Sequence, residues 1–273
     1  MDILNRAQGF TFNSLTYADL DEISINPNED LLIDHSDAIM ICNKTDKEYK
    51  IYWGAESVDA FNKAIEELSV HVDQLFSAGP QRLYMEFINP DLIPSLERIG
   101  FKVDSHFVDY WIYELDQPQS NADSNLWIRT IGPEDYARVS QITKSCRGVS
   151  RGFHGEEVEF VAEWNEDEHS CIFLAELDRT AVGTCFVNVY GFDSEKGPVL
   201  WLRELAVDPA YQNQGIGRKL MDQGLSWGYT RGAKRSYLAV EKQNHKAVHL
   251  YQQFGFHCKD EVGQINMALE PVK

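Results

Sequence analysis

Two closely spaced glycines constrain the fold of this chain more than any other sequence feature. Gly215 and Gly217 follow the apolar stretch Leu205-Ala-Val after a connection of residues 208–214, and they stand directly before an amphipathic pattern that contains Leu220 and Leu225. A buried strand therefore ends here and a helix begins. The first amides of a helix lack partners and carry a positive partial charge, and glycine lets an anion approach the main chain. The pattern predicts a phosphate-binding turn between a strand and a helix.

Two common phosphate loops do not match this turn. A dinucleotide fingerprint requires a third glycine three residues beyond Gly217, where Leu220 stands. A Walker A loop requires Gly-Lys-Ser/Thr, whereas Gly217 is followed by Arg218 and Lys219. The turn is therefore either a simple tight connection or the site of a different phosphate-bearing ligand.

The length and composition fit two globular domains. The 273 residues are 43% hydrophobic and 25% charged, which excludes a disordered, collagen-like or disulfide-stapled chain. No stretch is apolar enough to span a bilayer, and the first residues do not resemble a signal peptide. The five cysteines are scattered without a Cys-x-x-Cys pair, which favours a reducing cytoplasm, and we assign chemistry to none of them.

The negative charge is concentrated in the first half. The net charge is −18; residues 1–120 contain 22 acidic against 8 basic side chains, and residues 121–273 contain 21 against 17. Such a field repels nucleic acids and anionic membranes, so neither is an expected partner. It attracts cationic molecules, although an acidic surface also serves solubility alone.

A polar segment divides the chain. Residues Asp116 to Asn125 contain proline and lack either hydrophobic period. We therefore expect domains at 1–117 and 126–273 with a linker at 118–125. In the second domain the patterns predict the following helices and strands: strands 126–130, 171–177, 181–190, 198–207, 235–240, 256–260 and 264–269, and helices near 133, 156–165, from 215, and 245–254. This order implies a mixed sheet flanked by helices.

The sequence Leu205-x-Val-x-Pro, followed by Gln212-x-x-Gly-x-Gly217, resembles the coenzyme A pyrophosphate loop of the GNAT superfamily of N-acetyltransferases. The resemblance extends from Leu126 to Leu269. It implies the α/β (α+β) acyl-CoA N-acyltransferase fold, with acetyl-CoA as cosubstrate and no metal.

The resemblance also implies roles for residues of the loop. In this family the central strand and its successor splay apart at the coenzyme, so the backbone of the central strand pairs with the pantetheine arm. The Val207 amide would then point at the thioester oxygen. The residues implied to bind the coenzyme are Leu205, Ala206, Val207, Gln212, Asn213, Gln214, Gly215, Ile216, Gly217, Arg218, Asn244 and Ala247.

Tyr251 is the candidate general acid. The stretch from Asn244 to Phe256 is similar to the family's sequence of Asn, a small residue, Tyr and Gly-Phe, which would place the Tyr251 phenol beside the thioester sulfur. A phenol is protonated at neutral pH and can donate to a departing thiolate. Tyr251 also shares a helical face with apolar residues, as a core aromatic residue would, and Asn244 is also a good helix N-cap.

Glu204 is the candidate base that deprotonates the acceptor amine, directly or through water. A carboxylate on a central strand is costly to bury without a partner or a purpose. Strict alternation places Arg203 on the opposite face of the strand, so Arg203 is not its expected partner, and Glu204 could instead pair with another cation.

Two further groups are weaker candidates. His245 and His249 lie four residues apart on one helix, but a third metal ligand is missing, so we expect surface histidines. Seven acidic residues occupy the region that often shapes the family's acceptor pocket: Glu156, Glu157, Glu159, Glu163, Glu166, Asp167 and Glu168. If two of them faced inward, a cationic acceptor would be favoured; a solvated helix face is the ordinary interpretation.

The first half resembles a diverged copy of the second. Subtracting 155 aligns Asn244 with Asn89 and Gly255-Phe256 with Gly100-Phe101, in the shared order strand, Asn, helix, Gly-Phe, strand. The same subtraction replaces both loop glycines and puts Leu96 in the place of Tyr251. We therefore expect a degenerate GNAT-like domain without coenzyme, although an unrelated α/β domain would also fit.

Together these patterns predict an enzyme that transfers an acetyl group from acetyl-CoA to a primary amine by direct attack in a ternary complex. The acceptor is either a small cationic molecule, similar to a polyamine or an antibiotic, or the amine of a protein N-terminus or lysine. A non-catalytic module that binds coenzyme A or a protein partner is the alternative.

Overall fold

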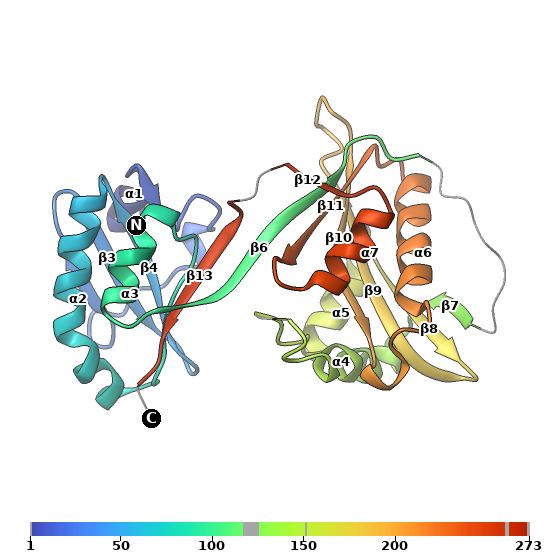
Figure 1. Cartoon of the computed structure of the whole chain (residues 1–273), viewed down its shortest axis with the longest axis horizontal. Helices are drawn as coiled ribbons and strands as arrows, with labels where there is room; N and C mark the ends of the chain where they lie inside the picture. Colours follow the sequence, from blue (N-terminus) through green and yellow to red (C-terminus); the bar gives the residue numbers. More distant parts are fainter. Residues whose placement is uncertain (1, 117–125, 151, 260–261, 272–273) are drawn as a thin grey trace. The chain divides into compact units, whose positions relative to one another are not determined.

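The computed structural model describes residues 2–116, 126–150, 152–259 and 262–271 (Figure 1). The chain forms two compact units. The first comprises Met1–His106 together with Val262–Lys273, and the second comprises Phe107–Glu261. The linker expected at 118–125 lies outside the described residues.

The first unit is a mixed sheet in the order β2-β3-β4-β5-β13-β6. Its core packs α2 and α3 on one face, and a smaller cluster packs α1 against β3. Its elements are α1 (Asp2–Gln8), β1 (Phe12–Asn13), η1 (Leu20–Glu22), β2 (Leu31–Asp34), β3 (Ala38–Lys44), β4 (Tyr49–Ala55), α2 (Val58–Ala78), β5 (Leu83–Met85), η2 (Pro90–Leu92), α3 (Ile93–Arg98), the first residues of β6 (Lys102–Ile112) and β13 (Gln264–Leu269).

The second unit is a mixed sheet in the order β6-β11-β10-β9-β8-β7, with β12 paired to β6. Its elements are the later residues of β6, β7 (Leu126–Thr130), η3 (Pro133–Asp135), α4 (Tyr136–Ser145), α5 (Val158–Glu166), β8 (Ser170–Leu177), β9 (Thr180–Tyr190), β10 (Val199–Val207), η4 (Pro209–Tyr211), α6 (Ile216–Thr230), β11 (Arg235–Glu241), α7 (His245–Gln253) and β12 (His257–Cys258).

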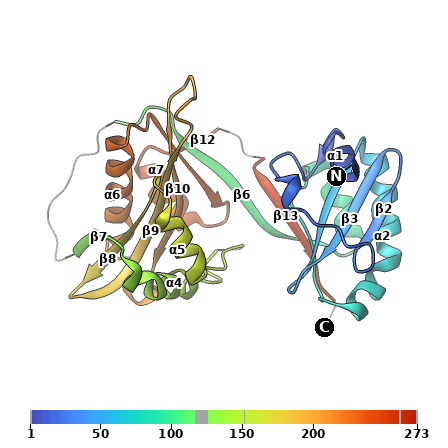
Figure 2. The same ribbon diagram turned by 180° about the vertical axis from the view of Figure 1, so that it is seen from behind.

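Helices cover both faces of this second sheet. α7 lies in front of the sheet in Figure 1, and α5 lies in front of it in Figure 2, which shows the opposite side. One core cluster lies under α6 and α7, and the other lies under α4 and α5. The strands are therefore apolar on both faces, as in β10, where Leu200 and Ala206 are both buried but belong to different clusters.

The expected mixed sheet flanked by helices is confirmed, and most expected strands and helices of the second half are present within one or two residues of the expected bounds. No helix in the described ranges is long and apolar enough to cross a membrane.

The expected division of the chain at 117 and 126 is wrong. The last strand, β13, pairs with β5 of the first unit, with Met267 opposite Met85. In exchange, residues Phe107–Ile112 of β6 pair with β11 of the second unit. The hydrophobic pattern shows that a segment is a strand but carries no information on its partner, because pairing is set by contacts distant in sequence. The two halves of the sequence therefore exchange strands: the end of the chain belongs to the first unit, and residues Phe107–Ile112 belong to the second.

The two units share the order of their central elements. β4 pairs in parallel with β5 through three residues, and β10 pairs in parallel with β11 through three residues. A helix connects each parallel pair, namely α2 in the first unit and α6 in the second. Gly100 and Gly255 both have a positive φ, of 100° and 84°, and the buried Phe101 and Phe256 follow them. The two halves thus share these local features, and their relation stays a prediction.

The strand exchange generates a prediction about Met267, which is fully buried in the first unit. Met267→Ala should lower the free energy of unfolding by about 2 to 4 kcal/mol, because it leaves a cavity. Hydrogen exchange should then accelerate in β4 and β5 more than in β10. The matched variant Leu238→Ala on β11 should show the reverse pattern. Faster exchange in β10 on Met267→Ala would contradict the assignment of β13 to the first unit.

Candidate functional site

β10 and β11 diverge in the middle of the second sheet. Their parallel pairing covers only Val199–Trp201 and Arg235–Tyr237. Beyond this point β11 continues along β6, and β10 continues along β9 to Val207. One edge of β10 is therefore left without a neighbouring strand, as the family resemblance implies.

The Val207 amide points away from β9, toward the edge that β11 has left. Asp208 donates its amide to the Val182 carbonyl on β9, and neighbouring amides of a strand point in opposite directions. The Val207 carbonyl accepts hydrogen bonds from Gln212 Nε2 at 3.0 Å and from Cys146 Sγ at 3.3 Å. The Gln212 side chain thus fastens the loop to the end of β10.

The first turn of α6 has no side-chain cap. Its N-cap is Gly215, in the left-handed conformation with φ 79°, and Asn213 also has a positive φ of 61°. By contrast, Ser57 caps α2 and Asn244 caps α7 through side-chain oxygens. The first amides of α6 therefore remain for an external acceptor, and the helix dipole favours an anion there.

Gly217 leaves space between α6, α7 and β10. A Cβ at this position would lie 3.7 Å from Leu250 Cδ2 and 3.8 Å from Val207 Cγ2, so a methyl group would fill the space without a clash. An uncapped helix start next to a free strand edge fits a diphosphate followed by an amide-bearing arm. The residues present therefore fit coenzyme A.

The other residues implied to bind coenzyme differ in exposure. Asn213, Gln214, Gly215 and Arg218 are exposed, Leu205, Val207, Gln212, Gly217, Asn244 and Ala247 are half-buried, and Ala206 and Ile216 are buried. The Arg218 side chain turns toward α7, where it bonds the Gln253 side chain and lies 5.2 Å from the Phe254 ring. Asn244 accepts a hydrogen bond from the Ala247 amide at 3.3 Å.

Glu204 is buried near the free edge of β10, with its side chain 7% exposed. Burial raises the pKa of this carboxyl from 4.5 to about 8; Arg203 opposes the shift, Glu156 increases it, and the Leu205 amide opposes it. The group is therefore largely protonated at neutral pH and ionises just above it, in the range useful for accepting a proton from an amine.

Strict alternation predicted that Arg203 and Glu204 would lie on opposite faces of β10, and this prediction is wrong. Arg203 lies on the same side of the strand as Glu204. Its Nη1 lies 3.9 Å from Glu204 Oε2. The register of β10 against β9 shifts between Leu202 and Glu204, so Arg203 is the extra residue of a β-bulge. A bulge breaks the alternation of side chains and brings Arg203 to the side of Glu204.

The Tyr251 ring packs edge-on against Phe256, with centroids 6.2 Å apart. Burial raises the pKa of its phenol, and the charges of Glu204 and Cys185 raise it further. The phenol therefore keeps its proton throughout the neutral range and acts as a hydrogen-bond donor. Tyr251 is thus a packing residue that also offers a protonated phenol.

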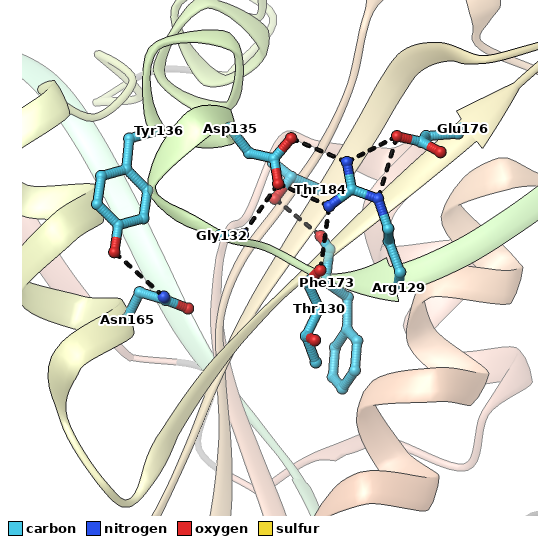
Figure 3. A network of polar contacts seen from close by, with 9 residues as sticks. All are labelled: Arg129, Thr130, Gly132, Asp135, Tyr136, Asn165, Phe173, Glu176 and Thr184. Carbon is cyan, nitrogen blue, oxygen red and sulfur yellow. Dashed lines mark hydrogen bonds and ion pairs between the residues drawn. The ribbon is translucent and has the colours of Figure 1, made fainter.

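A half-buried ion network fixes the start of α4 (Figure 3). The Arg129 guanidinium binds Asp135 through Nη1 and Nη2 at 2.6 and 2.9 Å, and binds Glu176 at 2.8 Å. Asp135 also accepts the Gly132 amide, and its hydrogen bonds to Arg129 lower its pKa. This two-pronged ion pair holds the N-terminal end of α4 in place. At the other end of α4, Cys146 donates its thiol to the Val207 carbonyl.

Among the seven acidic residues expected near the acceptor, only Glu156 is turned inward, and its Oε1 accepts from Arg203 Nη1 at 2.7 Å. The other six are exposed. His249 contacts the Gln253 side chain, and the described residues contain no cluster of three potential metal ligands.

Comparison with known proteins identifies the family. The model of the acetyltransferase (GNAT) family matches residues 136–256. Spermidine N(1)-acetyltransferase of Escherichia coli (strain K12) is 30% identical over 149 residues, which cover 50% of this chain and 74% of that protein.

The chain belongs to the GNAT acetyltransferase family. Spermine/spermidine N(1)-acetyltransferase of Bacillus subtilis (strain 168) is 37% identical over 76 residues, 27% of this chain, and the chain spans about half of that protein's length, 48%. A GCN5-related N-acetyltransferase from Sphaerobacter thermophilus has the same fold, with a TM-score of 0.62, 15% identity, and coverage of 87% of this chain and 82% of its own.

Two parts of this GNAT site were missed by sequence reasoning. Cys146 contacts Val207, although its spacing gave no signal. Arg203 lies against the aromatic rings of Phe160 and Trp164 on α5. The spacing of Phe160 and Trp164, four residues apart, could have indicated one aromatic face of a helix, but the bulge that delivers Arg203 has no sequence signature.

The raised pKa of Glu204 predicts a pH-dependent stability. The unfolded chain ionises this carboxyl near pH 4.5, but the folded chain retains the proton until about pH 8, so stability falls as pH rises between these values. Glu204→Gln should therefore raise the melting temperature at pH 8.5 and change it little at pH 4.5. The gain in the free energy of unfolding is on the order of 5 kcal/mol at most, since each pKa unit corresponds to about 1.4 kcal/mol. The exposed control Glu163→Gln should leave the melting temperature unchanged at both pH values. An equal effect at both pH values would contradict the raised pKa.

Proposed function

We propose that the second unit transfers an acetyl group from acetyl-CoA to a primary amine by direct attack in a ternary complex. The observation that carries this proposal is the uncapped, glycine-lined start of α6 beside the free edge of β10. Both features serve a ligand that has an anionic group and an amide-bearing chain. Bound acetyl-CoA would supply the thioester as acyl donor.

The main chain provides the binding groups. The first amides of α6, from Gly215 to Arg218, receive the diphosphate, and the free edge of β10 pairs with the amides of the pantetheine arm. The Val207 amide, directed at the same edge, donates to the thioester oxygen and stabilises the negative charge that develops on it during attack.

Two side chains handle protons. In the reaction the acceptor nitrogen forms a bond to the acyl carbon, the carbon–sulfur bond breaks, and one proton leaves the nitrogen while the sulfur gains one. Glu204 has a pKa of about 8, and its ionised form accepts the proton from the amine directly or through water. Tyr251, which remains protonated in the free site, acts as the general acid: it passes its phenolic proton to the departing sulfur and regains a proton from solvent.

A small amine with more than one positive charge is the acceptor class that we favour. Two family relatives carry names that specify spermidine or spermine. The net charge of −18 favours the approach of cations to this chain. The alternative acceptor is the amine of a protein N-terminus or lysine, and its acetylated product would be distinguished by its mass.

We further propose that the first unit is a diverged copy that binds no coenzyme. The start of its helix α2 is closed by Ser57 Oγ, which accepts the Ala60 amide at 3.2 Å. Where β4 leaves β5, the buried Trp53 donates its indole N–H to the Glu86 carbonyl at 3.0 Å and bridges the opening. Beyond β5 the main chain of β4 also pairs with β1, so both the helix start and the strand edge are occupied within the chain.

The direct test is an acceptor screen with acetyl-CoA, in which thiol release is followed and product masses are measured. Acetylation of a polyamine on nitrogen supports the proposal. Coenzyme binding without turnover of any small amine, peptide or protein acceptor would favour a non-catalytic module.

Tyr251→Phe removes the hydroxyl and retains the ring that packs on Phe256. We expect kcat to fall about 100-fold with unchanged affinity for acetyl-CoA, because only the transition state develops charge on sulfur. Steady-state kinetics and calorimetry measure the two quantities. An unchanged kcat would show that the phenol serves packing alone.

Gly217→Ala separates binding from folding. The new methyl group fits the fold, and alanine is the better helix former, so the melting temperature should stay equal or rise slightly. The methyl group occupies the space beside the coenzyme arm, so affinity for acetyl-CoA should fall about tenfold, equivalent to about 1.4 kcal/mol. In the control Gly224→Ala the Cβ meets Leu202 and Val187 at 3.2 Å, so stability rather than binding should fall. Undiminished affinity in Gly217→Ala would exclude this path for the coenzyme.

A further inference from the structure

The Arg203 guanidinium lies in a cage of aromatic rings. It is 4.4 Å from the Phe160 ring centroid and 5.5 Å from the Trp164 centroid. Trp201 packs edge-on against Trp164, with ring centroids 5.6 Å apart. We call Phe160, Trp164 and Trp201 the aromatic cage. Such rings attract a cation through their electron-rich faces, and the attraction is strongest where water is excluded.

Carboxyl groups complete this environment. Glu156 Oε1 is 2.7 Å from Arg203 Nη1, and Glu204 Oε2 is 3.9 Å from the same nitrogen. The Glu156 and Arg203 side chains are only 18% and 24% exposed. A partly desolvated carboxylate next to aromatic faces is a combination that selects an organic cation over a metal ion or an anion.

Arg203 itself leaves most of its hydrogen-bond donors unused within the described residues. It uses a single nitrogen for its hydrogen bond to Glu156, and its Nε and Nη2 bond none of the described residues. Arg129 uses all three nitrogens, in a fork on Asp135 and in bonds to Glu176 (Figure 3). In addition, the buried Trp164 Nε1 has no hydrogen-bond partner in the described part of the chain. An arginine with a purely structural role has its N–H groups hydrogen-bonded, as Arg129 has. Around Arg203, by contrast, several N–H groups have no hydrogen-bond partner among the described residues.

The cage also borders the proposed chemistry. Arg203 directly precedes Glu204, and the bulge turns both toward the same side of β10. A cation in the cage therefore lies next to the group that receives the proton of the acceptor amine. An acceptor with two positive groups could place one in the cage and present the other, as the free amine, to Glu204.

We propose that the aromatic cage with Glu156 binds the second positive charge of the acceptor, and that Arg203 occupies this site as an internal substitute until the acceptor displaces it. This inference rests on the proposed function. It specifies the acceptor class as a primary amine with a second ammonium or amidinium group a few bonds away. The long, partly exposed Arg203 side chain can move into water when it is displaced.

The test compares cadaverine, which has two amines, with pentylamine, which has one amine on the same carbon chain. Arg203→Met removes the competing charge and retains much of the side-chain volume. We expect the ratio of kcat/KM for cadaverine to that for pentylamine to rise about tenfold, through KM rather than kcat. Arg231→Met, which removes an exposed arginine 4.9 Å from the Trp227 ring, is the control and should leave the ratio unchanged.

A second variant identifies the carboxylate. Adding Glu156→Gln to Arg203→Met should reverse the gain in the ratio. A ratio that falls or stays constant in Arg203→Met, with a melting temperature near that of the wild type, would overturn the proposal and assign Arg203 a structural role.

A binding measurement keeps the inference separate from the proposed function and from any folding defect of Arg203→Met. In wild-type protein without acetyl-CoA, cadaverine should change the indole fluorescence, pentylamine should not, and Trp164→Phe should remove most of the change. Equal responses to both amines, or none, contradict the cage. If cadaverine gives the response but no amine is acetylated, the proposed function fails while the cation site stands.

Discussion

The divergence of β10 from β11 is the constraint on which the site depends. A strand in the middle of a sheet normally has both edges paired, and here one edge is free from Leu202 to Val207. The same divergence leaves room for α6 to begin at Gly215 without a side-chain cap. Unpaired amides are costly unless water or a ligand satisfies them, so the fold maintains a defined binding surface made of main chain.

The rest of the second unit keeps this opening in place. β9 holds β10 from the opposite edge, Gln212 and Cys146 hold the Val207 carbonyl, and the Arg129 fork fixes the helix that carries Cys146. The other side of the opening depends on β11, which is stabilised by residues Phe107–Ile112 of β6. The strand exchange thus makes the first half of the sequence part of the framework of the second unit.

Patterns that depend on neighbours in sequence could be predicted. The glycine turn, the strand before it, the helix after it and the cap at Asn244 all follow from local backbone chemistry, and the structure has each of them. The partner of the strand Gln264–Leu269 could not be predicted, because its apolar pattern suits either sheet. The bulge at Arg203 also left no trace in the sequence, so its proximity to Glu204 and the aromatic cage emerged only from the three-dimensional arrangement.

Calorimetric titration of the full chain with coenzyme A, and separately with pantetheine, tests the central claim most directly. If the amides at the start of α6 bind the diphosphate, coenzyme A should bind once per chain, and pantetheine, which lacks this group, should bind far more weakly. Equal affinity for both ligands, two sites per chain, or no heat from coenzyme A would contradict the account.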